Sequence, residues 1–528
     1  MKEKILSSLL TVFALSTLQA QTNTVSGVPR LVVGITIDQL RSDYLEAFVN
    51  LYGEKGFKQL WKEGKVFTDV SYNFSEVDRA SAIAAIYTGT TPFKNGVIAG
   101  QWLDRASLRP IDCTDDKDFM GYYTSECTSP KNLLVSTMTD ELEIASKGDA
   151  LVYAIAPYRD AAVLAAGHTA DGAYWLNDET GKWCTSSYYG DSPRWLERYN
   201  DNDGVDLRIN SLQWEPLHPL GAYDNPRGES DFSYGFVGER RYRKLKTSPC
   251  MNGEVNRLVK TIFENTKIGD DKVTDFLSVT YNAGAYHRET GHESDLEIQD
   301  TYARLDNDLA QLLSLIDEKV GLQHTLLFVT STGYIEHLPL DYTLFRVPSG
   351  EFHMNRATAL LNVYLMAVYG EGQYVEAYHD CQIYLNHKLL EDKRLNRKEV
   401  LEQCAVFLAD LSGVQKVYTS YDFLLGEMSD EYEQKRNSFH HDRSGDLIVE
   451  VNAGWKVMNT DSREIQLIHN GHVSFPLFLM GNGIVAEKVE TPITTECIAP
   501  TLTQFMRIRA PSGSTASAVS DYFTLPTK

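Results

Sequence analysis

The stretch VVGITIDQLRSDYL (residues 32–45) carries the clearest fold signal in the chain. A run of mostly apolar residues from Leu31 to Ile37 ends in a polar turn that begins at Asp38. A short apolar run bounded by turn residues is typical of a strand that is buried on both faces. Such strands occur mainly in parallel sheets that helices cover on both sides.

Similar runs recur along the sequence, and segments with helical spacing lie between them. We predict further buried strands at 151–155, 276–280, 326–330 and 475–480. Apolar residues follow helical spacing at 298–316 and at 400–411, and the second segment is followed by Gly413, a typical helix stop. This alternation predicts an α/β fold, a doubly wound, mainly parallel sheet with helices on both faces. We expect one domain over residues 21–528, with inserted cap segments at about 172–250 and 340–440.

Composition and charge narrow the function classes. The 528 residues are 43% hydrophobic, which suits a large buried core and excludes a disordered chain. With 50 Lys and Arg against 72 Asp and Glu, the formal net charge is −22. A nucleic-acid-binding surface is therefore not expected, because overall repulsion would oppose the encounter.

The N-terminus is typical of a secretory signal peptide over residues 1–20. Lys2 and Lys4 precede an apolar run from residue 5 to 15, and small and polar residues follow as far as Ala20. The alternative is a first helix of the fold. No later apolar stretch reaches the roughly 18 residues of a membrane span. We therefore expect a mature chain without a transmembrane segment and with a periplasmic or secreted location.

Seven cysteines remain after the predicted signal peptide. In an oxidising compartment this odd number allows three disulfides and one free thiol. Cys113 and Cys127 flank one short polar loop, so we predict that they form a disulfide. The sequence has no CxxC motif, so a thiolate zinc site has no support.

Several segments resemble one known family. Residues 32–45 and IYTGTTPFKNGVIAG (86–100) are similar to the alkaline phosphatase superfamily. The segments 166–189, 298–313 and RSGDLIVEVNAGW (443–455) narrow the resemblance to the secreted, phosphate-irrepressible alkaline phosphatases, which are related to the nucleotide pyrophosphatase/phosphodiesterase group. The resemblance extends from about residue 30 to 510. It implies a site at the carboxyl ends of the strands, where two zinc ions activate a Thr or Ser nucleophile.

Carried over residue by residue, the resemblance retains the first ligand and loses the nucleophile. Asp38 occupies the ligand position after the first strand. The nucleophile should lie ten residues before Gly89, and that position holds Arg79, whose guanidinium is permanently protonated. Ser81 is the alternative nucleophile, although a shift of two residues turns a side chain far around a helix. We expect Asp78 to cap the helix.

The next metal-ligand pair, Asp-x-x-x-His, is also lost. Without a gap, its two positions hold Ala285 and Glu289. A shifted register recovers His292 and places Arg288 where the Asp should be. Either register loses the pair.

The remaining positions also depart from the family pattern. Thr332 replaces the Asp of the expected Asp-His dipeptide. Ser474 replaces the last histidine, and a small gap in the alignment would restore a histidine there as His472. The phosphate-contacting Lys-x-Arg is replaced by residues that include Tyr158 and Asp160, and Arg159 is the cation nearest to it. The substrate-contacting Asn is replaced by Gly100.

These replacements predict an exported pseudophosphatase with no catalytic residue, no metal ligand set and no cofactor. Its vestigial site comprises Asp38, Arg79, Glu289, Thr332 and Ser474. Because a buried carboxylate needs compensation, we expect Arg79 to pair with Asp38, and with Glu289 as a second partner. The alternative is a zinc-dependent hydrolase of phosphate monoesters or diesters built on Asp38, His292 and His472. A third hypothesis, chemistry relocated to other residues, has no sequence signal.

Other polar or aromatic clusters have simpler interpretations. We read residues 440–442 (His-His-Asp) as a surface turn, since adjacent residues rarely face one ion, and we discount His469 and His472 in the same way. His168 is expected to be structural. The aromatic stretch 175–189 either packs the inserted region or lines a glycan- or peptide-binding face. As a binding or assembly module, the chain would have a protein or glycan partner in the cell envelope.

Overall fold

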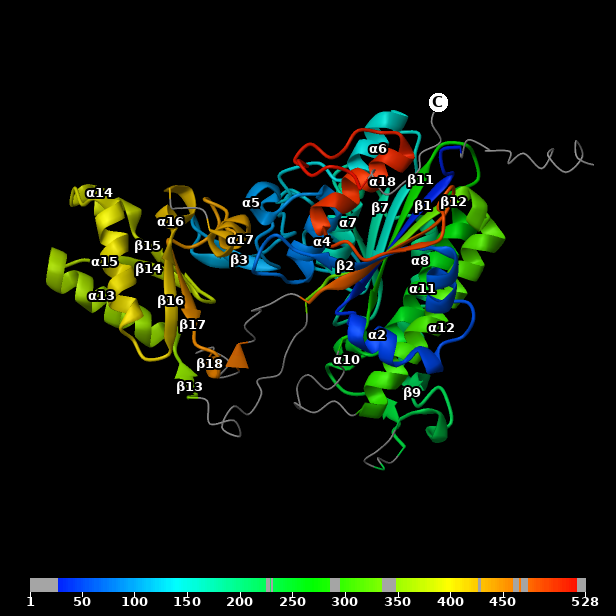
Figure 1. Cartoon of the computed structure of the whole chain (residues 1–528), viewed down its shortest axis with the longest axis horizontal. Helices are drawn as coiled ribbons and strands as arrows, with labels where there is room; N and C mark the ends of the chain where they lie inside the picture. The colour runs from blue at the N-terminus through cyan, green and yellow to red at the C-terminus, as the bar shows by residue number, and fades with distance from the viewer. Residues whose placement is uncertain are drawn as a thin grey trace, which may run out of the picture.

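The computed structural model describes residues 27–224, 228, 231–284, 295–334, 348–425, 429–458, 465–466 and 473–519. The predicted signal peptide lies outside these residues. Within them, no helix is both long and apolar enough to cross a membrane. Figure 1 shows a larger body built around one twisted sheet, and a smaller lobe beside it.

Among the described residues, the central sheet of the body has eleven strands. Its middle is parallel, in the order β12, β1, β11, β6, β7, and β20 and β8 run antiparallel to this block at its two sides. The strands are β1 (Leu31–Asp38), β2 (Lys65–Ser71), β5 (Gly121–Tyr122), β6 (Val152–Ala156), β7 (Gly172–Leu176), β8 (Trp183–Ser186), β11 (Asp275–Asn282), β12 (Thr325–Ser331), β20 (Phe475–Gly481), β21 (Glu487–Val489) and β22 (Ile493–Thr494). The mainly parallel α/β sheet is confirmed, and each of the five predicted strands is present with ends that differ by one or two residues.

Helices cover both faces of this sheet (Figure 1). One face carries α4 (Arg79–Thr88), α6 (Met138–Ser146), α7 (Arg159–Ala166) and α18 (Ile498–Met506). The other carries α2 (Ser42–Ala47), α3 (Phe57–Glu63), α8 (Arg194–Asn202), α10 (Arg241–Thr247), α11 (Cys250–Asn265) and α12 (Asp295–Lys319). Successive side chains of β1 enter opposite cores, since Val32 packs on the α4 side and Val33 on the α12 side. The sequence of this strand is apolar throughout because both of its faces are buried.

The smaller lobe has a sheet and a hydrophobic core of its own. The strand order is β14 (Val375–His379), β15 (Gln382–Leu385), β17 (Leu447–Val451), β16 (Val414–Thr419), all antiparallel. Its helices are α13 (Met354–Tyr369), α14 (His387–Asp392), α15 (Arg397–Ala409), α16 (Ser420–Leu425) and α17 (Asp430–Ser438). Further short strands are β13 (Gly350–Phe352), β18 (Trp455–Met458) and β19 (Ile465–Gln466). Because β17 belongs to this lobe, the lobe extends past the end of the cap segment expected at 340–440.

The other expected cap segment, at about 172–250, needs a correction. It begins with β7 and β8, which are strands of the central sheet. The rest of it forms α8, α9 (Val205–Arg208), the β9–β10 hairpin (Gln213–Trp214 and Tyr234–Gly235) and α10. A second hairpin of the body, β3–β4 (Gln101–Asp104 and Arg109–Asp112), and α5 (Pro92–Asn95) follow α4.

The predicted disulfide between Cys113 and Cys127 is absent. All seven cysteines lie among the described residues, and each is a free thiol. Cys113, Cys184 and Cys404 are buried, so they behave as small core residues.

Candidate functional site

Asp38 lies at the carboxyl end of β1, in the middle of the parallel strands. The parallel register places it opposite Asn282 at the end of β11, and Ile37 opposite Ser331 at the end of β12. Helix α4 begins at Arg79 on one side of this edge. Ligands of open α/β sheets bind at such carboxyl ends, so this is the place where the fold puts a site.

The carboxylate of Asp38 is almost completely buried, with 1% of the residue exposed. The hydroxyl of Thr332 donates to its Oδ1 at 2.9 Å, and this hydroxyl in turn accepts the backbone N–H of Gln39. The Tyr334 hydroxyl lies 3.4 Å from Oδ2. Burial raises the pKa of the Asp38 carboxyl, while Arg79 and Thr332 act in the opposite direction.

Arg79 is the positive partner of this carboxylate. Its Nη1 lies 3.6 Å from Oδ2 of Asp38, so the expected pairing is present. Its closest partner is Asp160 in the first turn of α7, which accepts from Nε at 3.1 Å and from Nη2 at 2.9 Å. The Tyr158 ring lies against the guanidinium, 3.8 Å from its Cζ. The guanidinium therefore lies between two carboxylates and on an aromatic face.

Sequence reasoning missed Asp160 as the main partner of Arg79. It noted that Asp160 stands at a position where the family has a cation, while Arg79 stands where the family has a neutral nucleophile. Relative to the family pattern, position 79 therefore gains a positive charge and position 160 changes from positive to negative, so the two changes are complementary. This pair of substitutions was the signal that could have identified the contact.

The residues beside Arg79 have structural roles. Asp78 is the N-cap of α4 and forms a capping box with Ser81, whose backbone N–H and hydroxyl both donate to its Oδ1 at 2.8 Å. The other oxygen of Asp78 accepts the backbone N–H of Gly100 at 2.6 Å. The predicted cap is confirmed, and Ser81 is held in that cap with its side chain buried. Its hydroxyl bonds to the backbone and side chain of Asp78 within this cap.

The other vestigial positions differ in their placement. Thr332 is buried against Asp38, as described above. Ser474 is exposed, and its hydroxyl donates to Asp69 at 2.6 Å. Glu289 and the alternative ligands His292 and His472 lie outside the described residues, as does His469. The second partner expected for Arg79 therefore stays a prediction.

A cavity of about 320 Å³ opens beside Arg79 and is lined mainly by polar side chains. Its cations already have partners. Arg159 contacts Asp112 at 2.8 Å, and the buried Lys246 pairs with Asp178. Burial lowers the pKa of the Lys246 ammonium, although Asp178 opposes this shift.

The one thiol in the lining of this cavity is not activated. Burial raises the pKa of the Cys113 thiol well above its usual range, and neighbouring carboxylates such as Asp160 add to the shift. The thiolate is the nucleophilic form of cysteine, so this side chain offers no nucleophile.

The described residues around Asp38 do not fit a pair of divalent cations. Zinc sites need three or four ligands from Cys, His, Asp or Glu. Around Asp38 the described side chains are two hydroxyls and one guanidinium. Among the described residues, one cluster brings three His, Cys, Asp or Glu side chains close enough to share an ion, with ligand atoms within 4.8 Å of one another. It lies at residues 440–442.

The cluster at 440–442 is a turn, as expected. Nδ1 of His440 accepts the backbone N–H of Asp442 at 3.4 Å, and burial lowers the pKa of His440 to about 4. His441 and Asp442 are exposed.

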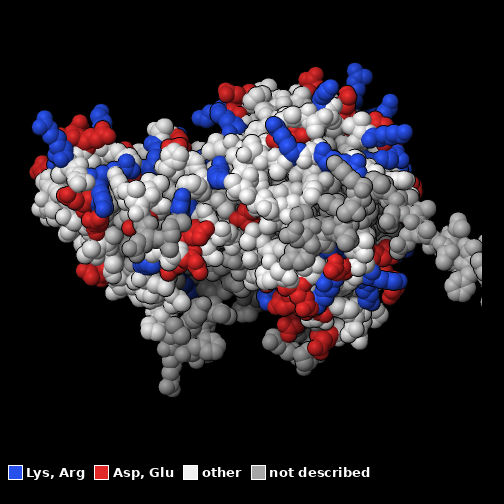
Figure 2. Space-filling view, turned by 45° about the horizontal axis from the view of Figure 1, so that its top comes forward, with Lys and Arg blue, Asp and Glu red and all other residues white. Residues whose placement is uncertain are grey.

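His168 and the two tryptophans of the aromatic stretch 175–189 have structural positions. His168 lies between Asp140 and the Leu133 carbonyl, 2.9 Å from each. Trp175 and Trp183 are buried in strands β7 and β8, which places them in the core. Figure 2 shows acidic and basic side chains interspersed on the face it draws, so that face has no continuous basic band.

The comparisons with known proteins agree with this fold. The family model described as type I phosphodiesterase / nucleotide pyrophosphatase matches residues 32–473. The chain is 28% identical to a protein of Myroides odoratus named calcium-transporting ATPase, over 93% of this chain and 94% of that one. It is 27% identical to the alkaline phosphatase PafA of Elizabethkingia meningoseptica, with 93% and 94% covered. The crystal structure of wild-type PafA superimposes with a TM-score of 0.80 at 26% identity, over 93% of this chain and 98% of that one. The chain belongs to the type I phosphodiesterase / nucleotide pyrophosphatase family, with an alkaline phosphatase-like fold.

Proposed function

We propose that this protein is an exported, non-catalytic member of its family, in which an ion pair replaces the hydrolytic centre. The observation that carries the proposal is the position of Arg79. Arg79 is the first residue of helix α4, where the resemblance places the nucleophile. Its guanidinium lies between the carboxylates of Asp38 and Asp160.

Metal-assisted phosphoryl transfer requires a nucleophile and a bound metal ion, and Arg79 is unsuited to both. A guanidinium stays protonated, so it cannot attack phosphorus. Its charge also lies 3.6 Å from the retained ligand carboxylate, where it would repel a divalent cation that shared this carboxylate. The negative charge that a metal would compensate already has a partner.

The same residues suit a stable scaffold. Arg79 forms a bidentate hydrogen-bonded pair with Asp160, which is among the stronger polar contacts, and an ion pair with Asp38. Retention of the fold without its chemistry favours a role in binding or assembly. The partner that we propose is a protein or glycan of the cell envelope.

Hydrolysis of phosphate monoesters or diesters is the second candidate, and family membership favours it. It requires that Asp38 share a metal with His292 and His472, both outside the described residues. The two candidates differ in whether the protein binds stoichiometric zinc.

The test uses the chain from residue 21, purified after incubation with excess zinc and desalting. Metal content is measured by mass spectrometry, and turnover is measured with p-nitrophenyl phosphate and bis-p-nitrophenyl phosphate. We expect less than one zinc per chain, and turnover equal to that of Asp38→Ala. PafA serves as the active control. Two zinc ions per chain, with turnover that Asp38→Ala abolishes, would establish the hydrolase instead.

The export part of the proposal has a separate test. Cell fractionation of the full chain should place the mature protein in the periplasm or medium, with its N-terminus at Gln21. A full-length protein retained in the cytoplasm would contradict it.

A further inference from the structure

Within the part of the chain that the structure describes, strand β14 leaves one edge of the smaller sheet without a neighbouring strand. It is the terminal strand in the order β14, β15, β17, β16, and β15 pairs with only one of its edges. Such an edge presents backbone N–H and C=O groups that can pair with an added strand, although the Val375 N–H already donates to Asn362 and the Val375 C=O accepts from Gln373.

A cavity of about 840 Å³ follows β14. Its lining includes all six consecutive residues from 375 to 380. Successive side chains of a strand point to opposite faces, so a cavity above one face would contact only alternate residues. Contact with every residue places this cavity along the edge of the strand.

Two elements form the walls of this groove. One wall is helix α13, which contributes Met354, Thr358 and Asn362 at one face. The other is the β3–β4 hairpin of the body, which contributes Leu103 and Pro110. The groove therefore lies where the two lobes meet, a common place for binding sites.

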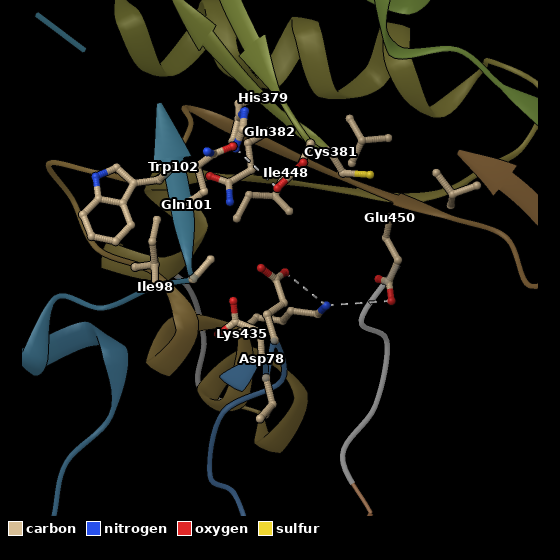
Figure 3. A pocket seen from close by; sticks show the side chains of 16 residues that line it. Asp78, Ile98, Gln101, Trp102, His379, Cys381, Gln382, Lys435, Ile448 and Glu450 are labelled. Atoms are coloured by element: carbon tan, nitrogen blue, oxygen red, sulfur yellow. Dashed lines mark ion pairs between the residues drawn. The ribbon is translucent and has the colours of Figure 1, made fainter. Parts of the chain in front are cut away.

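A second, smaller cavity of about 120 Å³ continues the groove, because both cavities are lined by Gln101, His379 and Asp380. Figure 3 shows this cavity from close by, with His379 and Gln382 of the smaller lobe above it and Lys435 below.

The hairpin geometry identifies the backbone groups that face the groove. His379 pairs with Gln382 across a two-residue turn, so this closing pair exchanges backbone hydrogen bonds. Hydrogen-bonded and non-hydrogen-bonded pairs alternate along an antiparallel ladder. Tyr378, opposite Ile383, is therefore a non-hydrogen-bonded pair, and its N–H and C=O point away from β15.

The charges along the groove are mainly negative. Glu376 and Asp380 line the larger cavity, and none of the described residues in its lining is Lys or Arg. In the smaller cavity, Lys435 lies 3.8 Å from Glu76 and 3.9 Å from Glu450, so two carboxylates surround one ammonium (Figure 3). A ligand with positive side chains would complement this surface.

We propose that the groove binds an extended, basic segment of a partner protein, which adds a strand to the outer edge of β14. The main chain of the peptide pairs with Tyr378. Alternate side chains contact the apolar wall at Leu103 and the acidic rim at Glu376. The inference does not depend on the loss of hydrolysis, because the groove runs along β14 and not at Asp38.

The experiment measures fluorescence anisotropy of fluorescein-labelled peptides with the full mature chain. The probe is a seven-residue peptide of alternating Lys and Val, which is long enough to cover the five residues of β14. Its controls are the Glu/Val counterpart and a Lys/Val peptide N-methylated at every residue, which keeps its side-chain charges and has no backbone N–H to donate along either edge. We expect saturable binding of the probe and at least tenfold weaker binding of both controls.

Three variants locate the site. Tyr378→Pro removes the outward N–H and leaves the ladder to β15 intact, and Glu376→Lys reverses a groove charge. Both should weaken probe binding at least tenfold. Glu402→Lys, on the exposed surface of α15, makes the same charge change elsewhere and should leave binding unchanged. Circular dichroism checks folding, and if Tyr378→Pro fails to fold, Glu376→Lys and the N-methylated peptide still decide.

Equal binding of the N-methylated peptide would overturn strand addition, and equal binding by Glu376→Lys would overturn the site. No saturable binding of the Lys/Val probe would overturn the proposal as a whole. The zinc and turnover assays above are read separately, so either proposal can fail alone.

Discussion

Replacement of Arg79 by Met tests whether the guanidinium compensates the charge of Asp38. Met keeps an unbranched side chain and removes the cation. At an effective dielectric constant of about 20, two unit charges 3.6 Å apart attract by about 4.6 kcal/mol. Arg79→Met removes this attraction and leaves Asp38 buried. Removal of one partner from a buried pair usually costs about 3–5 kcal/mol.

Without Arg79, Asp38 can become protonated instead of remaining charged in the folded protein. The free energy of this protonation sets an upper limit on the loss of stability, and the limit depends on pH. To keep a carboxyl neutral above its unfolded pKa of about 3.9 costs about 1.36 kcal/mol per pH unit. The limit is therefore about 5 kcal/mol at pH 7.5 and about 1.5 kcal/mol at pH 5. The expected loss in the free energy of unfolding is about 3–5 kcal/mol at pH 7.5 and about 1–1.5 kcal/mol at pH 5.

The assay is urea unfolding, followed by circular dichroism at both pH values. Arg243→Met is the matched control, because Arg243 lines the same cavity and forms an exposed ion pair with Asp178. Its loss should be below about 1 kcal/mol at both pH values. A loss below 1 kcal/mol for Arg79→Met, or an equal loss at pH 5 and 7.5, would refute charge compensation.

Three further predictions concern titration and redox state. Burial raises the pKa of Asp308 to about 7, so its carboxyl destabilises the fold as the pH rises from about 4 to 7. In calorimetry, Asp308→Asn should therefore raise the Tm at pH 8 and leave it nearly unchanged at pH 4. Despite burial, His387 and Arg105 hold the pKa of Asp446 well below its usual range, so this carboxylate stabilises the fold above about pH 4; Asp446→Asn should lower the Tm at pH 7, and by less at pH 3, where an equal decrease would contradict the assignment. A thiol assay on the unreduced protein in guanidinium chloride should count seven thiols, and a count of five or fewer would show disulfides.

The five central strands were predictable because burial on both faces makes them apolar throughout. Leu31 and Ile37 are fully buried, as are Phe276 and Leu326, so each position contributes to the signal. Strands β7 and β8 were assigned to a cap instead. They carry Tyr and Trp near the side of the sheet, where aromatic residues also suit an inserted segment.

The smaller lobe could be located only in part. Its helix at 397–409 gave a helical pattern, whereas β17 lies 28 residues after the end of β16 at Thr419. Pairing between strands so distant leaves no local pattern in the sequence. The predicted disulfide failed for a similar reason, because proximity along one loop does not fix the distance or direction of two cysteine side chains.

The residues of the candidate site were predictable from family motifs, but their geometry was not. Family motifs place Asp38 and Arg79 at neighbouring positions, and electrostatics then predicts their pairing. The contact with Asp160 depends on how α7 approaches α4, which no single motif encodes. Once both helices are placed, one guanidinium satisfies two carboxylates. Loss of the positive charge at this point would leave two anions near each other, whereas loss of Asp160 would leave Arg79 paired with Asp38, so substitution of Arg79 is expected to destabilise the fold more than substitution of Asp160.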